Sequence, residues 1–73
     1  MEWKNINVQF GNILRKIREG RGLSQESFSE ICGISRAYYG RIERGEHSAT
    51  LELCQKISDA TGLPFSELFA DII

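Results

Sequence analysis

The segment from Gln25 to Arg44, QESFSEICGISRAYYGRIER, constrains the fold more than any other part of this 73-residue chain. Apolar residues recur at helical spacing on both sides of Gly33, which predicts two short amphipathic helices joined by a tight turn. Glycine suits that turn because it adopts a left-handed backbone at little cost. Ser24 and Ser35 precede the two segments and are typical helix caps. The segment therefore predicts a helix-turn-helix over residues 24–44.

Three more helical segments flank this motif, with no convincing strand or repeat, so we expect one all-α, five-helix domain over residues 1–73. The first predicted helix runs from about Asn7, its cap, to Glu19, after an N-terminal arm of residues 1–6. Thr50 caps a fourth helix that closes at Gly62, and Pro64 opens a C-terminal helix within residues 63–73. The apolar positions predicted on these helices are Phe10, Ile13, Leu14, Ile17, Phe28, Ile31, Cys32, Leu51, Leu53, Cys54, Ile57, Ala60, Phe65, Leu68, Phe69 and Ile72.

Composition excludes several classes of protein. No apolar run approaches the roughly 18 residues that cross a bilayer, and the N-terminus has no signal-peptide core, so we expect a cytoplasmic protein. Cys32 and Cys54 each lie within an apolar helical repeat and are expected to be buried thiols in a cytosolic chain, with a disulfide or redox switch as the alternative. Two lone cysteines and one distant histidine do not form a zinc site. No Ser/His/Asp or Cys/His set is present, which argues against an enzyme. The sequence predicts no cofactor.

The charge distribution is asymmetric although the net charge is only −1. Residues 1–45 carry eight Lys/Arg against five acids, whereas residues 46–73 carry one Lys against five acids. The basic half contains the helix-turn-helix, which is what a DNA-binding face requires.

The predicted third helix, residues 36–44, has one dry face and one basic face. At about 100° per residue, three arginines and two small residues share a face opposite Tyr39 and Ile42. A basic face that only contacts water would not need the small residues Ala37 and Gly40. Glycine inside a helix also destabilises that helix by about 1 kcal/mol relative to alanine. We therefore expect close approach to a DNA groove, with base contacts from Arg36, Ala37 and Arg41 and a phosphate contact from Arg44.

These motifs resemble the helix-turn-helix family of lambdoid phage repressors and Cro proteins, the XRE-type family. The similarity covers residues 15–69 and includes GLSQE, the Gly33 turn, IERG, TLE and SELF. It implies a lambda-repressor-like fold, with phosphate contacts from Gln25 and Ser35 and a structural salt bridge between Arg18 and Glu43. Gly40, His47 and Ser48 are further candidates for phosphate contact, with a solvated loop as the alternative at the last two.

Three positions depart from the family pattern. Ser29 replaces a usual alanine, Tyr39 replaces an aliphatic residue, and Glu46 stands where many relatives are basic. The loop from Glu46 to Leu51 lacks the proline of many repressors and is similar to that of controller proteins of restriction–modification genes. Phage- or plasmid-type repressors are the close alternative, and all of these origins imply a bacterial setting.

A single domain of this type reads only a few base pairs, so we expect a homodimer on an inverted-repeat, double-stranded operator. Phe65, Ile72 and Ile73 are the candidate dimer interface. The alternative function is an antitoxin or protein-interaction module, whose partner would use the same apolar residues. A contact with RNA polymerase through Glu26 and Glu30 is a further candidate, and the sequence does not distinguish activation from repression.

Overall fold

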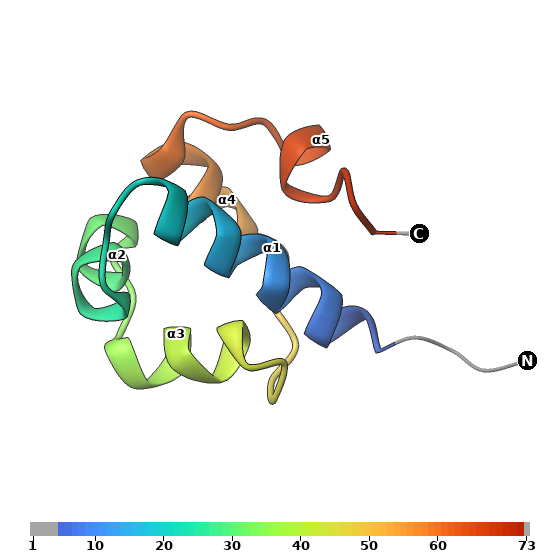
Figure 1. The fold of residues 1–73 in the computed structure, drawn as a ribbon, viewed down its shortest axis with the longest axis horizontal. Helices are drawn as coiled ribbons and strands as arrows, with labels where there is room; N and C mark the ends of the chain where they lie inside the picture. The colour runs from blue at the N-terminus through green and yellow to red at the C-terminus, as the bar shows by residue number, and fades with distance from the viewer. Residues whose placement is uncertain (1–4, 73) are drawn as a thin grey trace, which may run out of the picture.

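The computed structural model describes residues 5–72, which form five helices and no strand (Figure 1). This is the all-α architecture that the sequence predicts. The helices are α1 (Ile6–Gly20), α2 (Gln25–Cys32), α3 (Arg36–Glu43), α4 (Leu51–Thr61) and α5 (Phe65–Leu68). Helix α1 packs against both α3 and α5, and α2 packs against both α3 and α4. Within residues 5–72 no helix is long and apolar enough to cross a membrane.

Side-chain caps set the start of four helices. The hydroxyls of Ser24, Ser35 and Thr50 each accept the backbone N–H three residues later, as the sequence predicts. The predicted cap of α1 is wrong, because Asn5 rather than Asn7 fills that role. Asn5 is extended and its Oδ1 accepts the N–H of Asn7 at 2.9 Å, so Ile6 is helical and does not belong to an arm. Residues 1–4 of the predicted arm lie outside the described residues.

The turn between α2 and α3 uses the left-handed backbone predicted at Gly33, whose φ is 74°. Its N–H donates to the Glu30 carbonyl, and the next N–H donates to the Ser29 carbonyl, which closes the end of α2. Ser29 is 1% exposed and its hydroxyl donates to the Glu26 carbonyl at 2.8 Å. Ser29 is therefore small enough for the buried face of α2, and its buried hydroxyl has a hydrogen-bond partner.

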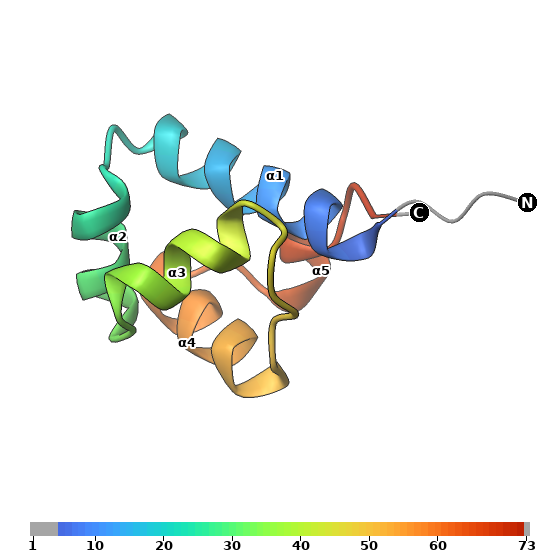
Figure 2. The same cartoon turned by 90° about the horizontal axis from the view of Figure 1, so that it is seen from below.

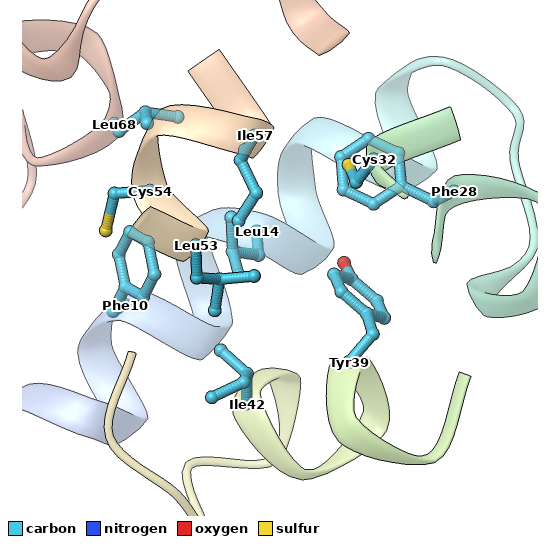
Figure 3. Packing of buried hydrophobic residues seen from close by; sticks show 10 residues of the cluster. All are labelled: Phe10, Leu14, Phe28, Cys32, Tyr39, Ile42, Leu53, Cys54, Ile57 and Leu68. Carbon is cyan, nitrogen blue, oxygen red and sulfur yellow. The ribbon is translucent and has the colours of Figure 1, made fainter. Parts of the chain in front are cut away.

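The core lies where α1, α2, α3 and α4 meet, with Leu68 closing it from α5 (Figure 3). Two predicted core residues are instead on the surface: Ile31 is 55% exposed and Leu51 is 78% exposed. The buried stripe of α2 passes through Phe28 and Cys32, which leaves Ile31 outside it. Leu51 is the first residue of α4 and precedes that helix's buried positions. The core residues are Phe10, Leu14, Phe28, Cys32, Tyr39, Ile42, Leu53, Cys54, Ile57 and Leu68.

The C-terminal helix is shorter than expected, since α5 covers four residues and turns follow it. Leu68 is fully buried, whereas Phe65 and Phe69 are partly buried against the core. Their rings pack edge to face with centroids 5.8 Å apart. The aromatic rings therefore hold this segment onto the domain, although it is not a continuous helix.

Candidate nucleic-acid interface

Helix α3 lies on the outside of the bundle, and in the view of Figure 2 it runs between α1 above it and α4 below it. Its inner face carries Tyr39 and Ile42, which are 0% and 1% exposed. Its outer face carries the exposed side chains of Arg36, Ala37 and Arg41. The fold therefore brings the three predicted base-contacting residues together on one accessible surface.

Two of the outer arginines have acidic neighbours. Arg36 lies 3.7 Å from Glu26 of α2, and both side chains are largely exposed. Arg44, which caps the end of α3, donates from Nε to Glu46 at 2.8 Å. That hydrogen bond raises the pKa of the Arg44 guanidinium and lowers the pKa of the Glu46 carboxyl. Glu46 therefore belongs to the surface formed by α3, a role that sequence reasoning did not give it.

A buried ion pair joins α3 to α1 beneath this surface. Arg18 donates from Nε and Nη2 to the two carboxylate oxygens of Glu43 at 2.9 and 2.8 Å, and from Nη1 to the Leu23 carbonyl. The side chain of Glu43 is only 4% exposed. Burial alone would raise its pKa, but hydrogen bonds led by Arg18 hold the pKa below the usual value. The pair fixes the orientation of α3 relative to α1.

Gln25 extends this network, and Tyr39 lies close to it without joining it. Gln25 donates from Nε2 to Glu43 at 3.1 Å, so the amide braces α3 from the start of α2. Tyr39 packs its ring edge to face on Phe28 with centroids 5.3 Å apart. Burial raises the pKa of Tyr39, and its hydroxyl forms no hydrogen bond with the residues that the structure describes.

The contact between α1 and α3 also depends on Gly11, which sequence reasoning missed. A Cβ added at Gly11 would lie 2.2 Å from the backbone oxygen of Glu43. The two helix backbones therefore meet at a distance that only glycine permits. The sequence held one indication of this role, because Gly11 is a helix-weakening residue in the middle of the apolar repeat of α1.

The remaining predicted contacts lie at the two ends of α3. Ser35 is exposed and its hydroxyl caps the helix by accepting the Tyr38 N–H. His47 is exposed beside the Tyr38 ring, with centroids 5.4 Å apart. Ser48 accepts a hydrogen bond from the side chain of Asn7 at 3.2 Å, which ties the loop after α3 to the start of α1.

An apolar groove of about 470 Å³ lies at the edge of the core, between the starts of α1 and α4 and the C-terminal segment. Ile6 and Leu51 contribute large exposed side chains to it. Ile72 lines this groove, whereas Phe65 does not. Ile73, the third predicted interface residue, lies outside the described residues. The full lining is Ile6, Asn7, Phe10, Ser48, Ala49, Leu51, Cys54, Phe69 and Ile72.

The cysteines and acids do not assemble a metal centre in the described part of the chain. Cys32 and Cys54 are buried free thiols, and burial raises the pKa of each. No group of three or more His, Cys, Asp or Glu residues among positions 5–72 is arranged to hold a metal ion.

A short helix pair with a left-handed glycine turn and an exposed arginine face defines a helix-turn-helix DNA-binding domain. Residues 14–68 match the helix-turn-helix family, and the chain belongs to it. It is a DNA-binding transcriptional regulator and not an enzyme.

Several relatives are controller proteins. The chain is 45% identical over 69 residues to control protein C.MunI of Mycoplasma sp., with 93% of each chain covered. It is 37% identical over 65 residues to control protein C.BamHI of Bacillus amyloliquefaciens, covering 88% of this chain and 80% of that one. The crystal structure of the restriction-modification controller protein C.AhdI from Aeromonas hydrophila superimposes with a TM-score of 0.84 at 36% identity, covering 90% of this chain and all of the other.

Proposed function

We propose that this protein is a sequence-specific regulator that binds an inverted-repeat, double-stranded operator as a homodimer and controls restriction–modification genes. The single observation that carries the proposal is the outer face of α3. Its arginines and Ala37 are exposed together, and the Arg18–Glu43 pair holds that helix against α1. The 45% identity to C.MunI, which extends over 93% of each chain, supports the controller role.

In this proposal α3 enters the major groove with its N-terminal end deepest. Arg36 and Arg41 present guanidinium forks that match the O6 and N7 acceptors of guanine, and Ala37 allows close approach. These three residues are the proposed base contacts.

Contacts with the phosphates of the DNA backbone would surround the residues that contact bases. The amide nitrogen of Gln25 has two N–H donors and uses one on Glu43, which leaves one for a phosphate. The Ser35 hydroxyl accepts a backbone N–H as a cap and still has a hydrogen to donate. The remaining proposed phosphate contacts are Arg44, His47 and Ser48. Gly40, the other candidate from the sequence, is buried beneath the Arg44 guanidinium, so we do not place a phosphate contact there.

The apolar groove is the proposed homodimer interface. Leu51, Ile6 and Ile72 form an apolar surface that a second copy would cover, and dimers of such domains read half-sites about one helical turn, 34–36 Å, apart. Phe65 packs on Phe69 and does not line the groove, so we place it outside the centre of this interface.

The same exposed apolar groove suggests a second candidate function. In that case a toxin or another protein would occupy the groove, and DNA binding would be secondary. A contact of RNA polymerase with α2 stays a proposal as well. Glu30 is exposed there, whereas Glu26 already has Arg36 as a neighbour.

The exchange Arg36→Ala tests sequence reading. It should weaken binding to the operator duplex by ~1–3 kcal/mol and relax the preference at one base pair. Binding to a random duplex should fall much less, since only phosphate attraction is lost there. The matched control Lys56→Ala removes an exposed cation from α4 and should change neither affinity. Equal losses on both duplexes in the Arg36→Ala variant would contradict base reading.

A further inference from the structure

The side chain of Arg44 is folded back along α3 and does not extend freely from its end. Its guanidinium covers Gly40, one turn earlier, and makes that glycine buried although it lies on the outer face. A Cβ added at Gly40 would lie 2.9 Å from Nη1 of Arg44 and 3.6 Å from Cζ and Nη2. A side chain at this position would therefore displace the guanidinium from the place where it lies over α3.

The acid that holds Arg44 is itself held by the backbone. Gly45 has a left-handed φ of 76° and packs on α1, where an added Cβ would lie 2.7 Å from Cγ2 of Val8. The N–H of Glu46 donates to the Arg41 carbonyl at 2.8 Å. The loop after α3 therefore places the Glu46 carboxylate beside Nε of Arg44.

We propose that Glu46 is a positioning residue that, together with the space left at Gly40, holds Arg44 as a preformed clamp for a DNA phosphate. The inference rests on the proposed function, because it concerns how that same surface grips DNA.

The hydrogen-bonding capacity of arginine explains why an acid is useful at this position. Glu46 occupies Nε alone, so the Nη1 and Nη2 groups still have N–H donors for a phosphate oxygen. An arginine that is already oriented loses less side-chain freedom when it binds. An unpaired acid here would only repel the DNA backbone. The glycine, which weakens a helix, has its function in making room for the guanidinium.

The test is a set of single and double variants titrated against a labelled random-sequence duplex at two salt concentrations. Arg44→Ala should lower the slope of log affinity against log salt by about 0.9. Glu46→Ala and Gly40→Ala should each weaken binding by roughly threefold to tenfold while Arg44 is present. In the Arg44→Ala background, Gly40→Ala should have no effect and Glu46→Ala should strengthen binding, because only its repulsion of phosphate is left.

Opposite outcomes would overturn the clamp. One is a Gly40→Ala loss that persists without Arg44, which would mean that the glycine itself approaches the DNA. Another is a Glu46→Ala variant that binds more tightly in both backgrounds, which would make the acid a competitor of phosphate. The control Glu67→Ala, which removes an exposed acid from α5, should leave binding unchanged.

Stability and wild-type binding separate the possible failures. Gly40→Ala should raise the melting temperature while it weakens DNA binding, because alanine favours a helix more than glycine does. A purely structural role for Gly40 would move both quantities in the same direction. If the wild type itself fails to bind DNA, the proposed function fails; if it binds and the variants act additively, only the clamp is wrong.

Discussion

Replacing Arg18 by methionine tests the buried link between α1 and α3. The exchange keeps the length and apolar stem of the side chain but removes three hydrogen bonds of 2.8–2.9 Å. Glu43, whose side chain is 4% exposed, would then have only the Gln25 hydrogen bond at 3.1 Å. Breaking a buried pair from one side typically costs ~3–5 kcal/mol, because the remaining charge is buried without compensation.

That loss is large for a domain of this size. A 73-residue domain has a total stability of roughly 4–11 kcal/mol, so the variant should lose about a quarter of it or more. Urea titration followed by far-ultraviolet circular dichroism, at one fixed protein concentration, measures the difference. The double exchange Arg18→Met/Glu43→Leu should recover most of the loss, because two apolar side chains can replace a buried pair.

The pH dependence gives an independent check. In the wild type the pKa of Glu43 is lowered, so its stabilising effect is present above the unfolded pKa of about 4.3 and is lost as pH falls through the folded value. Without Arg18 burial should raise that pKa, and the carboxyl should take up a proton well before pH 4. The stability deficit of the variant should therefore shrink from pH 7 to pH 4. A deficit below about 1 kcal/mol at pH 7, or one independent of pH, would refute this reasoning.

Three further exchanges test other parts of the account. Gly11→Ala should destabilise the domain by about 2 kcal/mol or more, because its Cβ would lie 2.2 Å from the Glu43 oxygen; a stabilised variant in the same urea assay would contradict the close contact. Tyr39→Phe should change stability by less than about 1 kcal/mol, since the hydroxyl has no hydrogen bond within residues 5–72, and a larger loss in thermal melts would reveal a partner. Leu51→Ser should weaken self-association in sedimentation equilibrium, whereas Ile31→Ser, an exposed exchange on α2, should not; equal behaviour would remove the groove from the interface.

The helices and turns could be predicted from sequence because their determinants are local. Ser24, Gly33 and Thr50 each specify a helix start or turn through their own backbone or side chain, and the structure shows them in those roles. The start of α1 was misplaced because two asparagines stand close together and both suit a cap. The length of the last helix was overestimated because aromatic packing, not helical repetition, holds the chain after Leu68.

The candidate site was less accessible to sequence reasoning. Helical periodicity groups Arg36, Ala37 and Arg41 on one face, but it gives no side-chain rotamers. The position of Arg44 over Gly40 depends on Glu46, which reaches back after a left-handed glycine. The exposure of Leu51 likewise depends on how α4 meets its neighbours, which its own helical repeat does not specify. Contacts between elements therefore explain most of what the sequence alone did not reveal.

The most direct test of the central claim is selection of binding sites from random duplex DNA by the purified wild-type protein, followed by titration of the enriched duplex at two salt concentrations. The account predicts enrichment of an inverted repeat whose half-sites lie about one helical turn apart. It also predicts that the enriched duplex binds at least about a thousandfold more tightly than random DNA. Weak, salt-sensitive binding without any enriched sequence would contradict the account and favour a domain that mainly holds a protein partner.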